Sequence, residues 1–136
     1  MDTSQIITQI VLSHYPSVQA IYLFGTHGTE YERADSDVDI ALLFPPDTAR
    51  GIGSLVLSSC EIDLVDRLCT PIDLINLRIV STVFQMEIIR ADRRIYCSDE
   101  FAADEFEMLT ISYYQKLNEE RKEIIKAFIN DPRGWG

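Results

Sequence analysis

Hydrophobic residues recur at helical spacing near the start of the chain and then fall into short continuous runs. Residues 4–14 carry Ile and Val at intervals of three and four, with Ser4 placed to cap a helix and Pro16 to end it. Apolar runs at 18–24 and 38–44 are rich in Val, Ile, Tyr, Leu and Phe. These two runs predict buried strands.

The rest of the chain predicts helices and two further short strands. A helical period over about 47–65 predicts one helix, capped by Asp47 or Thr48. Strands are predicted after Pro71 and at 94–97, with a helix from Val80 to Ala91 between them. One long helix is then predicted over about 100–130. Its expected core-facing stripe is Phe101, Glu105, Leu109, Tyr113, Leu117, Ile124 and Phe128.

Length and composition indicate one domain. The chain has 136 residues, of which 46% are hydrophobic, and this is enough for a compact core. We expect residues 1–136 to form a single domain, with a core at about 18–97 and the long helix at about 100–130. That helix carries more aromatic and apolar surface than a small sheet covers, so part of it is expected to meet another chain.

The two predicted strands at 18–24 and 38–44 carry the strongest candidate chemistry. Gly25 permits a turn after the first strand, and free amides with the hydroxyl of Thr26 would suit a phosphate. Asp37 and Asp39 are two positions apart at the start of the second strand, so their side chains share one sheet face. Adjacent carboxylates need a compensating cation, and Mg²⁺ prefers oxygen ligands of this kind.

Two simpler interpretations apply to these carboxylates. An ordinary polar turn accounts for a bare Asp-x-Asp. A calcium loop beginning at Asp35 fails, because Ile40 stands at its sixth position in place of Gly and Pro46 at its twelfth in place of Glu. A third carboxylate would come from Asp63 or Asp73, and we choose Asp73 because Asp63 falls in a predicted helix.

Gly25-Thr26, ten intervening residues and then Asp37-Val38-Asp39 resemble the Gly-Ser-x10-Asp-x-Asp signature of the minimal nucleotidyltransferases, with Thr26 in place of Ser. Residues 72–77 resemble the strand that carries the family's third Asp, here Asp73, although the second acidic position of that strand is Asn76. The resemblance implies an α/β fold of the polymerase beta-like type, a small mixed sheet flanked by helices. It also implies ATP as substrate, with Mg²⁺ held by Asp37, Asp39 and Asp73.

The small size resembles the MntA-type antitoxins of HEPN/MNT toxin-antitoxin modules. That resemblance implies transfer of AMP to a tyrosine of a HEPN ribonuclease toxin, which neutralises the toxin in a stable complex. Two alternatives stay open: an antitoxin that neutralises by binding alone, and a nucleotidyltransferase acting on a small molecule. Alanine substitutions at Asp37 and Asp39 distinguish neutralisation by binding alone from neutralisation by catalysis. A protein that acts only by binding would still protect cells that express the toxin after these substitutions.

Charge and cysteine content limit the expected binding partners and the expected cellular compartment. The formal net charge of −10 argues against direct binding of nucleic acid, which requires clustered Lys and Arg. The three cysteines form no Cys-x-x-Cys pair, so a reducing cytoplasm is the simplest setting. No apolar run approaches the length of a membrane span. Arg33, Arg78, Arg93 and Arg94 are the basic residues nearest the proposed site in sequence.

Overall fold

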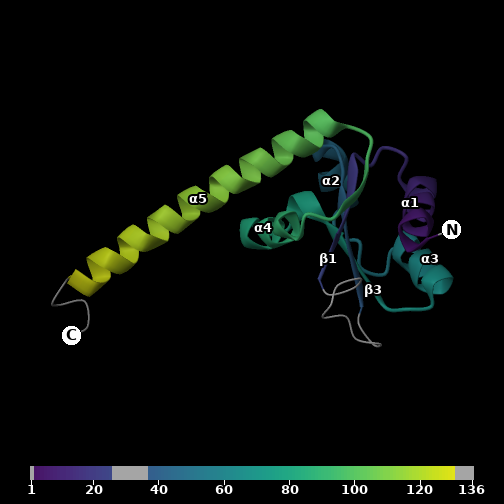
Figure 1. The fold of residues 1–136 in the computed structure, drawn as a ribbon, viewed down its shortest axis with the longest axis horizontal. Coiled ribbons are helices and arrows are strands. Elements are labelled where there is room, and N and C mark those ends of the chain that lie inside the picture. Colours follow the sequence, from purple (N-terminus) through teal and green to yellow (C-terminus); the bar gives the residue numbers. More distant parts are fainter. Residues whose placement is uncertain (1, 26–36, 131–136) are drawn as a thin grey trace.

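The computed structural model describes residues 2–25 and 37–130, built around a four-stranded mixed sheet in the order β3-β2-β1-β4 (Figure 1). β1 (Ala20–Phe24) pairs antiparallel with both β2 (Val38–Leu43) and β4 (Arg94–Cys97). β3 (Ile72–Asn76) runs parallel to β2 at the edge of the sheet. All four predicted strands are therefore confirmed, and the sheet is mixed as the family resemblance implied.

One face of the sheet packs against α1 (Thr3–His14) and α3 (Ser59–Leu68). The strands contribute alternate apolar residues to this face, because successive side chains of a strand point to opposite sides. Its fully buried side chains come from both helices and from the strands. They include Ile7, Val11, Ile21, Ile40, Leu42 and Leu64.

The opposite face packs against α4 (Thr82–Ala91) and the first turns of α5 (Glu100–Asn130). Tyr22, Phe24, Ala41 and Leu43 supply the strand side of this second core. Figure 1 shows α4 and α5 on one side of the sheet, with α1 and α3 on the other. The two layers of helices thus leave one end of the sheet, where β1 finishes and β2 begins, without a covering helix among the described residues.

The N-terminal cap of α1 differs from the prediction. The carboxylate of Asp2 accepts a hydrogen bond from the backbone N–H of Gln5 at 2.8 Å, and the Gln5 side chain accepts one from the N–H of Asp2 at 3.1 Å. This reciprocal pair is a capping box. Ser4 was the wrong cap, since it already lies within the first turn of the helix.

The single helix predicted over 47–65 is also wrong. The structure has two helices there, α2 (Pro46–Ile52) and α3. Gly53 ends α2 with a φ of +67°, and Leu57 then takes a φ of +59° before Ser58 caps α3. A left-handed backbone cannot continue a right-handed helix, so this region must break despite its helical period.

The long C-terminal helix has the predicted bounds but a different buried side. Ala103, Phe106 and Thr110 are its buried residues, whereas Phe101 is 78% exposed and Leu109 44% exposed. The predicted stripe was therefore wrong, because α5 covers the sheet only with its first turns and then extends away from it (Figure 1). Within residues 2–25 and 37–130, no helix has both the length and the apolar character needed to cross a bilayer.

Candidate active site

The turn after β1 is shaped around a carboxylate on the neighbouring strand. All five residues of β1 are buried, and the strand ends at Phe24, the register partner of Asp39. Gly25 follows with a φ of +75°, and a Cβ added to it would overlap Oδ2 of Asp39. Only glycine combines this backbone conformation with the space that the carboxylate occupies.

Asp39 and Asp73 are direct partners in the parallel ladder between β2 and β3. Parallel neighbours lie about 4.8 Å apart and point their side chains to the same face. That face also carries Ala41 and Ile75, so the two carboxylates lie on the side covered by α4 and α5. Asp39 is half-buried and Asp73 is exposed. The structure therefore brings together Gly25, Asp39 and Asp73 at one end of the sheet.

Asp37 lies one residue before β2 and is exposed. Its position two residues from Asp39 keeps it at the same end of the sheet. Thr26, the predicted phosphate-binding hydroxyl, lies outside the described residues, as does Arg33. Of the five carboxylate and turn positions chosen from sequence, three thus lie next to one another, Asp37 adjoins them in the chain, and Thr26 is outside the described residues.

The oxygen ligands at this end of the sheet fit a hard divalent cation. In the described part of the chain, no group of three His, Cys, Asp or Glu side chains is gathered closely enough to hold a metal ion by itself. Mg²⁺ does not require such a cage, because it commonly binds one or two carboxylates and completes its shell with water and substrate phosphates. The in-register pair of Asp39 and Asp73 meets that smaller requirement.

Asp63, the alternative third carboxylate, and Asn76, which stands where the family has a second acidic residue, both make structural contacts elsewhere. Asp63 lies on α3 and pairs with His14 of α1 at 2.5 Å, on the face opposite the carboxylate pair. Asn76 is 3% exposed, and its Nδ2 donates to the carbonyls of Ala49 at 3.0 Å and Gly53 at 2.9 Å. It therefore caps the end of α2. The choice of Asp73 over Asp63 agrees with this placement.

Two of the arginines that lie near the motif in sequence, Arg78 and Arg94, form contacts away from the turn at Gly25. Arg78 donates to the carbonyl of Phe44 and to Gln19, and its guanidinium lies 5.4 Å from the ring centre of Phe106. Burial lowers the pKa of Arg78. Arg94 pairs with two carboxylates of α5 at 3.2 and 2.8 Å. Neither side chain is directed by these contacts toward the turn at Gly25.

Sequence reasoning missed a polar contact that fixes α5 to the face of the sheet that carries Asp39 and Asp73. The hydroxyl of Tyr22 donates to Oε2 of Glu107 at 2.9 Å, and Nη1 of Arg94 donates to the same oxygen at 2.8 Å. Burial, followed by the nearby charge of Glu107, raises the pKa of Tyr22. The one signal in the sequence was Tyr22 inside an otherwise apolar strand, because a buried tyrosine needs a partner for its hydroxyl.

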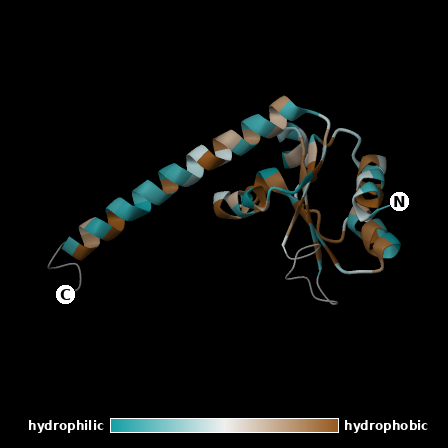
Figure 2. Ribbon diagram, in the orientation of Figure 1, coloured by the Kyte–Doolittle hydropathy of each residue, from teal (hydrophilic) through white to brown (hydrophobic). Residues whose placement is uncertain are grey.

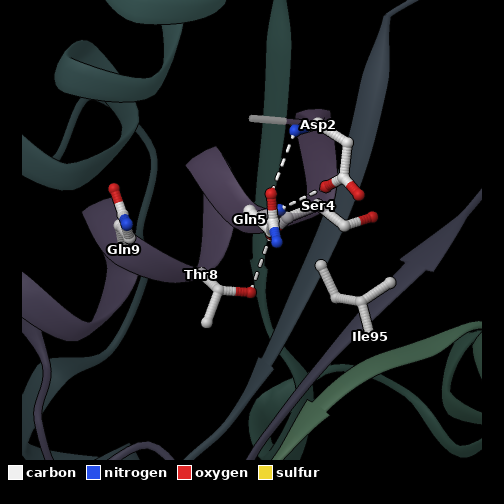
Figure 3. Close-up of a pocket in the computed structure, with 6 residues that line it drawn as sticks. All are labelled: Asp2, Ser4, Gln5, Thr8, Gln9 and Ile95. Atoms are coloured by element: carbon white, nitrogen blue, oxygen red, sulfur yellow. Dashed lines mark hydrogen bonds between the residues drawn. The ribbon is translucent and has the colours of Figure 1, made fainter.

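One surface pocket lies away from the carboxylates, beside α1. It measures about 470 Å³ and is lined by residues of α1 together with Ile95 of β4 (Figure 3). Figure 3 shows the capping pair of Asp2 and Gln5 beside it. The pocket adjoins the α1 face of the sheet, whereas Asp39 and Asp73 lie on the other face. The strand ends are therefore the better candidate for chemistry.

Comparisons with known proteins match most of the chain. A family model described as "Polymerase beta, Nucleotidyltransferase" matches residues 6–101. A curated relative from Shewanella oneidensis, named protein adenylyltransferase MntA, is 33% identical over 120 residues, which cover 88% of this chain and 82% of the relative.

Solved structures extend the likeness to the whole described fold. A chain of a toxin-antitoxin crystal structure with AMP-PNP is 28% identical with a TM-score of 0.72, covering 93% of this chain and 98% of that one. A second match comes from the complex of a tri-AMPylated Shewanella oneidensis HEPN toxin with an MNT antitoxin. It is 28% identical with a TM-score of 0.67, covering 93% of this chain and 96% of the matched chain.

Proposed function

This chain belongs to the polymerase beta nucleotidyltransferase family, and we propose that it is an antitoxin that acts as a protein adenylyltransferase. In this proposal it transfers AMP from ATP to a tyrosine of a cognate HEPN ribonuclease toxin and so neutralises the toxin. The likeness to protein adenylyltransferase MntA, and to an MNT antitoxin in complex with an AMPylated HEPN toxin, supports this assignment.

The observation that carries the proposal is the register of Asp39 against Asp73 beside the turn at Gly25. Two carboxylates directly opposite one another destabilise a sheet. A fold retains such a pair where a cation and a phosphate group are to be bound, and perturbed charge arrangements of this kind mark functional sites. An ordinary polar turn before β2 would not explain why β3 places a second carboxylate, Asp73, directly opposite Asp39.

We assign the triphosphate of ATP to the turn at Gly25 and Thr26, and one or two magnesium ions to Asp37 and Asp39. Asp73 would bind the second ion or accept the proton of the attacking hydroxyl. Mg²⁺, when bound there, offsets negative charge on the α-phosphate and on the departing pyrophosphate. Gly25 leaves room for both the Asp39 carboxylate and an approaching phosphate, because it has no side chain. The half-buried position of Asp39 fixes its carboxylate between the turn and β3.

The transfer itself is a displacement at phosphorus. The tyrosine oxygen forms a bond to the α-phosphorus, the bond from that phosphorus to the bridging oxygen breaks, and pyrophosphate leaves with the electron pair. We assign the released hydroxyl proton to Asp73, which is exposed at the start of β3 and can meet an incoming hydroxyl.

The free thiols of Cys60, Cys69 and Cys97 suit a reducing cytoplasm as the place of reaction.

The test is to incubate the protein with α-labelled ATP, Mg²⁺ and its cognate HEPN protein. We expect label on a tyrosine of the HEPN protein, lost on removal of Mg²⁺ with EDTA and reduced at least about 100-fold in Asp39→Asn, a range typical for loss of one charged catalytic group. Label in small molecules would instead favour a small-molecule nucleotidyltransferase. Protection of cells by an unreactive Asp37→Ala, Asp39→Ala double variant would favour neutralisation by binding alone.

A further inference from the structure

Beyond Thr110, no residue of α5 is buried within the part of the chain that the structure describes. The last buried residue of α5 is Thr110, and the last described contact with α4 is the Arg90 guanidinium, 4.9 Å from the ring centre of Tyr114. From residue 118 to residue 130 every side chain is exposed, and Figure 1 shows this segment projecting away from the sheet. Most helical stability in proteins comes from tertiary packing, so a partner that packed on this segment would stabilise it.

One side of this segment is apolar. Leu117, Ile124, Ile125 and Phe128 recur at three- and four-residue spacing together with Arg121, and we call these five residues the distal stripe. Ile124 is 68% exposed and Ile125 57% exposed. Figure 2 shows hydrophobic patches interrupting the hydrophilic ribbon along this part of the helix. Such spacing suits a facing helix in a two-helix or coiled-coil contact.

Arg121, the charged residue of the distal stripe, distinguishes between a second copy of this chain and a different protein as the binding partner. Arg121 lies midway between Leu117 and Ile125. A parallel, in-register pair of α5 helices would place Arg121 opposite Arg121, and an antiparallel pair centred on the distal stripe would set each Arg121 against Ile124 of the other copy. A like-charge pair and a cation buried without a carboxylate are both unfavourable. The stripe accordingly fits a different protein, one that presents apolar residues and a carboxylate.

The distal stripe belongs to the helix that covers the catalytic face. The first turns of α5 pack with Tyr22 and Phe24 on the side of the sheet that carries Asp39 and Asp73. Tyr22 and Arg94 both hydrogen-bond Glu107, which fixes the direction in which α5 leaves the sheet. A protein seated along α5 therefore lies on the same side as the carboxylate pair.

We propose that the distal stripe is the docking surface for the protein substrate, contacted by an apolar helix of the HEPN toxin that sets a carboxylate against Arg121. This inference rests on the proposed function, because it takes the acceptor of AMP to be a HEPN protein. Docking on α5 raises the local concentration of the acceptor tyrosine near Asp39 and Asp73. Changes in the stripe should then raise KM for the toxin while leaving kcat unchanged.

The test compares Arg121→Glu and Ile124→Asp with Lys126→Glu. Lys126→Glu makes the same charge change as Arg121→Glu, but helical spacing places residue 126 about 140° away from residue 121 around the helix axis. Toxin binding is measured by calorimetry, and AMP transfer over a range of toxin concentrations. We expect the two stripe variants to bind the toxin about tenfold or more weakly. Their transfer should recover at saturating toxin, and Lys126→Glu should match the wild type.

The outcomes separate the docking proposal from the proposed function. Wild-type binding by both stripe variants, with circular dichroism showing an intact helix, would overturn the docking surface. So would a wild-type dimer in sedimentation that Ile124→Asp dissociates, because the stripe would then belong to a second copy. Asp39→Asn should bind the toxin normally and fail to label it. Stripe-dependent binding without labelling by the wild type would reject the transferase and keep the docking surface.

Discussion

Gly25 and Asp39 are fitted to one another across the pairing of β1 with β2. A Cβ added to Gly25 would lie 3.1 Å from Cγ of Asp39 and would overlap its Oδ2. Gly25 also has a φ of +75°, a conformation that side chains oppose. The requirement for glycine therefore has two separate sources, one in the backbone and one in the position of a proposed catalytic carboxylate.

Gly25→Ala should reduce both stability and AMP transfer. The left-handed backbone alone should cost about 1–3 kcal/mol of unfolding free energy. The added methyl group should also displace the Asp39 carboxylate, and a small misplacement of a catalytic group can lower the rate about 100-fold. Urea denaturation measures the first effect, and labelled AMP transfer per folded molecule measures the second.

Gly53→Ala is the matched control for that substitution. Gly53 has a φ of +67°, but no atom lies within 4 Å of the position of an added Cβ. The variant should lose stability through backbone strain and keep the activity of its folded fraction. Equal losses of specific activity in Gly25→Ala and Gly53→Ala would show that the contact with Asp39 is irrelevant to catalysis.

Asp73→Asn should stabilise the protein while it abolishes the reaction. Asp73 and Asp39 are cross-strand partners, and a like-charged pair costs a few tenths to about 1 kcal/mol relative to a neutral pair. Removing one charge should therefore raise the midpoint of urea unfolding without metal or nucleotide. The gain should shrink at 1 M NaCl, where exposed charges are screened. An unchanged or lower midpoint at low salt would argue against repulsion between the two carboxylates.

The strands and the carboxylate end of the sheet were predictable because local signals determine them. The alternation of side chains in a strand puts Asp39 on the face opposite Ile40, and the apolar run after Pro71 puts Asp73 in a strand. Which strands are neighbours is a property of the folded chain, and it was the pairing of β2 with β3 that made Asp39 and Asp73 direct partners. The role of Thr26 remains a prediction, since it lies outside the described residues.

The errors arose where distant contacts or backbone conformation decide the result. Glycine at position 53 takes a left-handed conformation that the helical period over 47–65 does not reveal. The buried side of α5 depends on the layer beneath it, where Tyr22 meets Glu107 across 85 positions in sequence. Periodicity identified that α5 is amphipathic, but it could not distinguish the side that packs on the sheet from the side left exposed beyond it.

Asn76→Asp should destabilise the fold by about 2–3 kcal/mol at neutral pH, because a carboxylate cannot donate the two hydrogen bonds that Asn76 gives to Ala49 and Gly53. It would also set a buried charge against two carbonyl oxygens. Burial favours the protonated acid, which can restore one donor, so the deficit relative to wild type should narrow near pH 4. Urea denaturation at both pH values checks this. A deficit independent of pH would indicate altered packing instead.

Cys60 should make the protein lose stability as pH rises above 9. Its side chain is fully buried, and burial, followed by the charges of Asp63 and Glu61, raises the pKa of the thiol from 9.0 to about 12. The unfolded thiol ionises first, so each pH unit between those values removes up to about 1.4 kcal/mol of unfolding free energy. Under reducing conditions, Cys60→Ala should flatten this decline between pH 9 and 10, whereas alanine at the exposed Cys69 should not. Parallel declines in both variants would assign the alkaline loss to other groups.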